Sequence, residues 1–158
     1  MRTALRHLIV TADDFGLDLA INEAVEQAHR EGVLTAASLM VGQAAARDAV
    51  ERARRLPGLR VGLHVTLTGA WPVLPAHQLP DLVDAAGRLP TNLPAFGWRL
   101  ATSGAARRQA EQEIRAQFQA FAQTGLTTND IAAIDALVTH DALRWLQPGA
   151  TAPLRAVQ

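Results

Sequence analysis

The chain has 158 residues, the size of one ordinary domain, and its 15 basic residues balance its 15 acidic ones, which argues against nucleic acid as a partner. The absence of cysteine excludes disulfides, thiolate metal sites and a cysteine nucleophile. With no apolar run of membrane-spanning length and a start too short for a signal peptide, we expect a cytoplasmic protein without a membrane span.

The first predicted element is a strand that leads into two neighbouring carboxylates. Residues 8–10 are apolar enough for a buried strand, and Gly16 marks its turn into a helix. Asp13 and Asp14 would lie at the carboxyl end of that strand, where α/β folds place their chemistry, and they can point the same way only if the backbone bends between them. One carboxylate could hold a metal ion while the other handles a proton. The plain alternative is that the pair caps the following helix.

Strands and amphipathic helices then alternate. A helix is expected between Asp18, a suitable N-cap, and Gly32, and the apolar run 35–41 is expected to form a second strand. A second helix closes at Pro57-Gly58, and residues 61–67 form a third strand. This alternation predicts an α/β fold of parallel strands joined by right-handed crossovers.

Residues 68–102 contain five prolines and three glycines, which predicts a long irregular loop. For its aromatic residues Trp71, Phe96 and Trp98, two interpretations are open: a surface that stacks on sugar or forms a lid, or side chains that pack the loop onto the fold, which we favour. Residues 105–123 then predict a helix whose apolar face consists of Ala110, Ile114, Phe118, Phe121 and Ala122.

Several motifs, in this order and spacing, resemble the YdjC-like carbohydrate deacetylases. They are Thr-Ala-Asp-Asp-Phe-Gly at 11–16, Ala-Ser-Leu-Met-Val at 37–41, Gly-Leu-His-Val-Thr-Leu at 62–67, the stretches 72–75 and 79–84, and Glu-Ile-Arg-Ala-Gln-Phe at 113–118. Within the family the chain is most similar to the members associated with hopanoid biosynthesis, the HpnK group. The resemblance implies a partial (β/α)-barrel of the polysaccharide-deacetylase type. It also implies metal-dependent removal of an N-acetyl group from an amino sugar or glycolipid.

The same resemblance implies roles for three residues. Asp13 would be the general base, and Asp14 and His64 would be ligands of a divalent metal ion, Mg²⁺ or Zn²⁺. Carboxylate oxygen and imidazole nitrogen suit zinc, while an oxygen-rich remainder filled by water would admit magnesium. Taken alone, a histidine in an apolar strand is more often a hydrogen-bonded core residue. Because the neighbouring strand is expected to end at Asp14, close to His64, we favour the interpretation of His64 as a metal ligand.

The resemblance stops after Gly125. The family pattern then calls for a strand with a His-x-His motif, which supplies a third ligand, and for the second half of the barrel. Residues 131–145 instead have helical apolar spacing, and His140, the only histidine left for that place, is expected to face water. We therefore divide the chain into 1–128, the first half of a barrel domain, and 129–158, a divergent helix and a loose tail, as in a truncated or frame-shifted gene product.

Two classes of function remain from the sequence. The first is a metal-dependent deacetylase whose ligand set is completed by water or a partner chain. The second is a truncated, inactive remnant or binding module with weak metal affinity, because catalytic zinc sites normally use three protein ligands. Three barrel strands would leave an open sheet edge, so a homo-oligomer that pairs through this edge is a further expectation. A magnesium phosphohydrolase is disfavoured, since no phosphate-binding glycine loop accompanies the aspartates.

Overall fold

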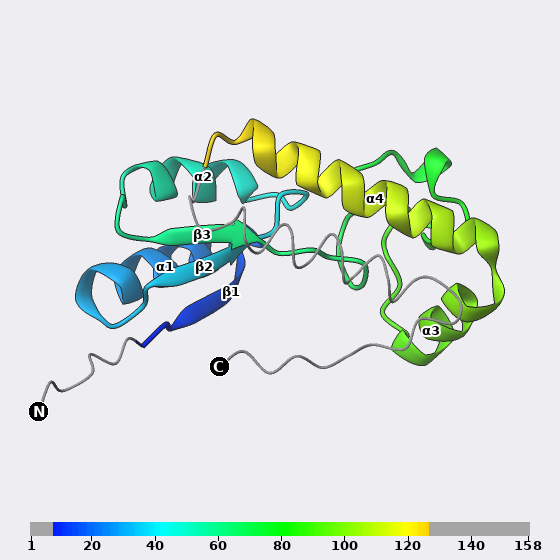
Figure 1. Ribbon diagram of the computed structural model, residues 1–158, viewed down its shortest axis with the longest axis horizontal. Coiled ribbons are helices and arrows are strands. Elements are labelled where there is room, and N and C mark those ends of the chain that lie inside the picture. The colour runs from blue at the N-terminus through cyan, green and yellow to red at the C-terminus, as the bar shows by residue number, and fades with distance from the viewer. Residues whose placement is uncertain (1–7, 127–158) are drawn as a thin grey trace, which may run out of the picture. The chain divides into compact units, whose positions relative to one another are not determined.

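The computed structural model describes residues 8–126, which belong to the first of two units of the chain, Met1–Thr127. The described elements alternate as the sequence predicts (Figure 1). They are β1 (Thr11–Phe15), α1 (Leu19–Glu31), β2 (Ala36–Leu39), α2 (Ala46–Arg54), β3 (Arg60–Leu63), the 3₁₀ turn η1 (Ala76–Gln78), α3 (Leu93–Thr102) and α4 (Gly104–Gln123). The predicted α/β class is confirmed, whereas a barrel stays a prediction. Among these helices, none has the length and apolarity needed to cross a membrane.

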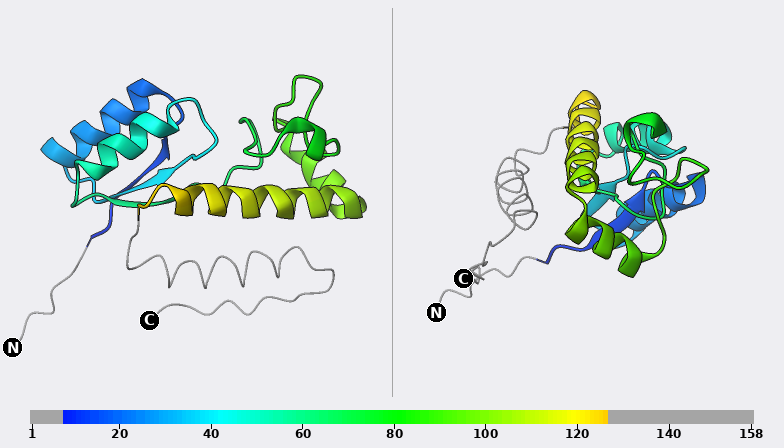
Figure 2. Two further views of the ribbon diagram at one scale, coloured as in Figure 1. Left: turned by 90° about the horizontal axis from the view of Figure 1, so that it is seen from above. Right: turned by 90° about the vertical axis from the view of Figure 1, so that its right-hand side faces the viewer.

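The strands form one parallel sheet in the order β1-β2-β3. Ser38 pairs with Gly62 in a register that stays constant along β2 and β3, whereas the pairing of β1 with β2, which starts at Thr11 and Ala36, shifts before Phe15. Helices α1 and α2 cover the same face of the sheet (Figure 2). We call the opposite face the open face. Because side chains alternate along β2, the buried Ala37 points toward the helices and Ser38 toward the open face.

The first strand begins later than the sequence predicts. Residues 8–10 were expected to be a buried strand, but Leu8 and Ile9 are 78% and 76% exposed. The reason is the register, since the first aligned pair joins Thr11 to Ala36 and only the carbonyl of Val10 receives hydrogen bonds from the start of β2. The apolar run therefore extends beyond the point where β2 begins.

The ends of α1 agree with the prediction. The Asp18 side chain accepts a hydrogen bond of 2.9 Å from the backbone of Ile21, and Gly32 is the C-cap. The cap of this helix is therefore Asp18, and the alternative in which Asp13 and Asp14 cap it is wrong. The layer between sheet and helices is apolar; its buried members include Phe15, Val25, Leu39, Ala49, Ala53 and Val61.

The proline-rich stretch is more regular than predicted, since it contains α3. Asn92 caps this helix by accepting from the backbone of Ala95, and Pro94 lies in the first turn, where a missing N–H costs nothing. Phe96 belongs to a buried cluster with Leu79, Leu82, Leu89, Ala106 and Ala110. The packing interpretation thus holds for Phe96. It is wrong for Trp98, which is 73% exposed, and only half right for Trp71, which is 48% exposed.

Helix α4 forms where the sequence predicts it, but its buried face differs. Ala110 and Phe121 are buried as expected, whereas Ala122 is exposed. Two polar residues, Glu113 and Gln117, are buried instead, with exposed fractions of 0% and 3%. Such burial requires hydrogen-bond partners, and the loop that follows β3 supplies them.

Glu113 and Gln117 hold this loop by its backbone. The two carboxylate oxygens of Glu113 accept from the N–H groups of Val73 and Leu74 at 2.8 and 2.9 Å. The Gln117 amide donates a hydrogen bond of 2.7 Å to the carbonyl of Thr66 and accepts one of 2.9 Å from the N–H of Thr66. Gln117 also donates to Glu113 at 2.7 Å, so the two side chains form one buried network that fixes residues 66–74 against α4.

Candidate functional site

The two aspartates lie at a bend in β1. Asp14 has φ +62°, the only positive value of a non-glycine residue in the described part of the chain, and the register with β2 shifts between Ala12 and Phe15. Left-handed backbone is uncommon outside glycine, although aspartate tolerates it better than most residues. This is the bend that the sequence requires if the two neighbouring carboxylates are to serve one site. Such backbone outliers cluster at functional sites.

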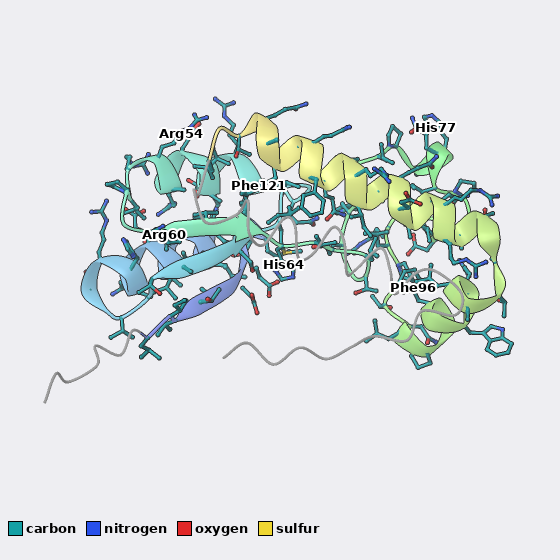
Figure 3. All side chains as sticks on the ribbon, viewed as in Figure 1. Arg54, Arg60, His64, His77, Phe96 and Phe121 are labelled. Atoms are coloured by element: carbon teal, nitrogen blue, oxygen red, sulfur yellow. The ribbon has the colours of Figure 1, made fainter. Side chains whose placement is uncertain are left out.

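Asp13, Ser38 and His64 meet on the open face. Ser38 on β2 donates a hydrogen bond of 2.8 Å to Asp13 Oδ1, and its Oγ lies 3.0 Å from His64 Nδ1. His64 directly follows β3, where its backbone N–H donates 2.8 Å to the carbonyl of Leu39. Figure 3 shows the imidazole at the carboxyl end of the strands.

Asp14 completes this group and approaches the same imidazole nitrogen, Nδ1. Its Oδ1 lies 3.7 Å from His64 Nδ1, and its backbone N–H donates a hydrogen bond of 3.4 Å to the same atom. The side chains of His64 and Asp14 are 28% and 49% exposed. His64 is therefore only partly buried and is not a residue of the buried core. We call Asp13, Asp14, Ser38 and His64 the polar cluster.

The hydrogen bonds of the polar cluster allow two tautomers of His64. With hydrogen on Nδ1, the ring donates to Ser38 Oγ, Ser38 donates onward to Asp13, and Nε2 keeps a free lone pair. With hydrogen on Nε2, the lone pair of Nδ1 accepts the hydrogen bond from the backbone N–H of Asp14. A ring nitrogen that carries hydrogen cannot bind a cation, so an ion shared between Nδ1 and Asp14 requires the tautomer with hydrogen on Nε2.

The donor set fits a divalent ion only in part. Two donors that each lie about 2.1 Å from one ion are at most about 4.2 Å apart, so 3.7 Å between Asp14 Oδ1 and His64 Nδ1 is compatible with a shared ion. Within residues 8–126, however, no group of three or more histidine or acidic side chains has the geometry of a metal site. The helix predicted at residues 131–145 and His140 fall outside the described residues. So does the segment in which the family pattern calls for a His-x-His motif.

The polar cluster does not have the geometry of a serine-hydrolase relay. In such a relay one imidazole nitrogen accepts the serine proton while the other is oriented by a carboxylate. Here Ser38 and Asp14 both approach Nδ1 of His64, so a single nitrogen would have to serve both purposes. Ser38 is better placed to orient Asp13 and His64 than to act as a nucleophile.

Sequence analysis missed Ser38 and Asn22 as site residues. Asn22 is fully buried in α1, and its side-chain oxygen accepts a hydrogen bond of 2.7 Å from the backbone N–H of Gly16. Gly16 directly follows β1, at the end of the bend. Its amide donates to the Ala45 carbonyl at 3.0 Å and to Asp48 at 2.8 Å. Arg52 holds the pKa of Asp48 below its ordinary value, with a smaller contribution from Asn22. The only signal for Asn22 was a polar residue within an otherwise apolar helix face.

Next to the polar cluster lies a shallow hollow that includes His64 and the loop fixed by Gln117. Its lining consists of Val41, Gly42, Gln43, His64, Thr66, Trp71, Val73 and Gln117. Most of these residues come from the segments that follow β2 and β3, at the same end of the sheet as the polar cluster.

Comparison with known proteins identifies the family. Residues 7–129 match the YdjC-like protein family. Carbohydrate deacetylases of Brevibacillus brevis and Geobacillus stearothermophilus are both 36% identical to this chain, over 86% and 80% of its length. The alignments cover 52% and 48% of those proteins, so the chain spans about half the length of these curated relatives. A crystal structure of a candidate cellobiose-phosphate cleavage protein from Enterococcus faecalis matches with a TM-score of 0.64 and 31% identity, covering 74% of this chain and 44% of that one. The chain belongs to the YdjC-like protein family.

Proposed function

We propose that this chain carries the catalytic base and two metal ligands of a hydrolase that removes the acetyl group from an N-acetylated sugar. The observation that carries the proposal is the approach of Asp14 Oδ1 and His64 Nδ1 to 3.7 Å beside Asp13. The relatives named carbohydrate deacetylase supply the reaction and the substrate class. The motif resemblance further favours a glycolipid of hopanoid biosynthesis as the substrate.

Each residue of the polar cluster then has a chemical role. A bound Mg²⁺ or Zn²⁺ would polarise the amide carbonyl and make water more acidic. Asp14 and His64 would hold that ion, and Asp13 would accept the proton of the attacking water. Ser38 keeps one oxygen of Asp13 occupied at 2.8 Å and so limits the directions in which the carboxylate can face.

Replacing Asp14 with alanine is expected to weaken binding of Zn²⁺ by about 100-fold, because removal of a ligand should cost at least as much as removal of a supporting residue. Isothermal titration of ZnCl₂ into the full chain measures this change. Asp18→Asn is the matched control, since it removes one nearby carboxylate while asparagine keeps the N-cap. Equal zinc affinity of Asp14→Ala and wild type would contradict the assignment.

Replacing Asp13 with asparagine is expected to lower acetate release from N-acetylglucosamine oligosaccharides by about 10²- to 10⁴-fold, the usual contribution of a general base. An enzyme-coupled acetate assay with added Zn²⁺ or Mg²⁺ measures the rate. Zinc affinity serves as the control, because Asp13 is not assigned as a ligand and the variant should still bind the ion.

The second candidate is a non-catalytic binding module. The observation that favours it is that, within residues 8–126, no group of three histidine or acidic side chains could hold a metal ion. Wild-type chain that binds zinc but releases no acetate would favour this second candidate.

A further inference from the structure

We propose that Trp71 is a stacking platform for a pyranose ring next to His64. The inference rests on the proposed function for its substrate class. Trp71 is 48% exposed and lines the same hollow as His64 and Thr66. A half-exposed indole forgoes much of the apolar burial that is available to this side chain, and its position beside a polar cluster is typical of a binding surface.

The backbone under the indole is fixed on both sides. The Gln43 amide donates 3.0 Å to the Trp71 carbonyl, and its oxygen lies 3.4 Å from the Trp71 N–H. At Gly42, a Cβ atom would lie 3.2 Å from the same carbonyl, so the two loops pack too closely for a larger residue without adjustment. Two residues on, Glu113 holds the N–H of Val73. The platform is therefore preorganised, which reduces the entropy cost of binding.

Arg88 completes the platform. Its guanidinium carbon lies 5.3 Å from the centre of the indole ring, within the range of a cation–π contact that restrains the ring. Hydrogen bonds between Gly69 and Pro90 and between Ala70 and Leu89 keep the two loop segments side by side. Arg88 is exposed, so its remaining N–H groups can donate to sugar hydroxyls.

The chemistry of this surface matches a carbohydrate. One face of a pyranose ring consists of C–H groups that pack on an aromatic ring, while the hydroxyls at its margin require donors and acceptors. The Arg88 guanidinium lies over one face of the Trp71 indole, so the pyranose ring would pack on the other face, with the guanidinium as a donor to its hydroxyls. Trp98 is the contrast within the same chain, because it is even more exposed, at 73%, but lies in α3 and does not line the hollow.

The test is isothermal titration of the β-1,4-linked trimer of N-acetylglucosamine into the full chain, in EDTA. Trp71→Ala is expected to raise the Kd about tenfold, in the range of one aromatic contact. Trp71→Phe should keep the Kd within about threefold of wild type, because phenylalanine retains an aromatic face. Trp98→Ala is the matched control and should bind as wild type does.

The platform is overturned if wild type does not bind the trimer, if Trp71→Ala binds it equally well, or if Trp98→Ala weakens binding as much. Far-ultraviolet circular dichroism and thermal unfolding of each variant separate a local effect from loss of fold. Acetate release is measured separately with Zn²⁺ present. Loss of trimer binding in Trp71→Ala without any acetate release by wild type would support the platform and reject the hydrolase. Acetate release by wild type, together with unchanged trimer binding by Trp71→Ala, would support the hydrolase and reject the platform.

Discussion

Replacement of Glu113 with alanine is expected to lower the free energy of unfolding by about 4 kcal/mol. Glu113 is fully buried, and its two oxygens satisfy the N–H groups of Val73 and Leu74. Alanine would leave both donors and the Gln117 amide without this partner, and each unsatisfied buried group costs about 1–3 kcal/mol. Urea unfolding followed by circular dichroism measures the difference.

Two further variants separate the hydrogen bonds from charge and helix propensity. Glu113→Gln keeps the side-chain size but turns one of the two acceptors into a donor that faces an N–H group, so we expect a loss of about 2 kcal/mol. Glu111→Gln changes the same residue type on the exposed side of α4, where Glu111 pairs with Arg115 at 2.6 Å. This control should change stability by less than about 1 kcal/mol. A loss as large in Glu111→Gln as in Glu113→Ala would contradict the role of the buried network.

Stability of the network also bears on the site. Glu113 and Gln117 hold residues 66–74, and this loop contributes Thr66, Trp71 and Val73 to the hollow beside His64. The polar residues of α4 therefore fix the position of a loop that lines this hollow. A long loop without regular structure can keep a defined surface only if its backbone groups find partners, which these side chains supply.

The sequence predicted well those features that depend on local patterns. Asp18 and Gly32 bound α1 as expected, because capping is set within a few residues. Strand alternation implied that Asp13 and Asp14 could point the same way only if the backbone bends between them, and Asp14 has a positive φ in the structure. Helix α3 was missed because Pro94 was read as a breaker, although proline is tolerated in a first turn capped by Asn92.

Features that depend on distant partners could not be read from periodicity. Hydrophobic patterns assign polar residues to the surface, yet Glu113 and Gln117 are buried because their partners lie about 40 and 51 residues away in the sequence. The opposite error occurred at Leu8 and Ile9, whose apolar side chains are exposed because β2 begins too late to pair with them. Ser38 belongs to the motif at 37–41, but its hydrogen bond to Asp13 and its contact with His64 depend on how the three strands align.

Replacing Asn22 with alanine is expected to lower the free energy of unfolding by about 3 kcal/mol, because the buried N–H of Gly16 and the carbonyl of Ala45 would both lose a partner. The change should also reach the site. Gly16, with φ +98°, directly follows the strand that carries Asp13 and Asp14, so a looser Gly16 should weaken zinc binding by about tenfold, as loss of other supporting residues does. Urea unfolding and zinc titration measure the two effects.

Asn22→Asp isolates the donor half of the amide. It keeps an oxygen for Gly16 but directs a second oxygen toward the Ala45 carbonyl and the Asp48 carboxylate, so it should be destabilising near neutral pH. Burial and the neighbouring Asp48 should raise the pKa of the new carboxyl, and a raised folded-state pKa means that stability is regained as the pH falls. Gln27→Ala removes an exposed hydrogen bond to Glu31 from the same helix and should change neither stability nor zinc affinity appreciably. Wild-type stability of Asn22→Ala, or equal losses in Gln27→Ala, would show that the amide of Asn22 does not anchor the bend.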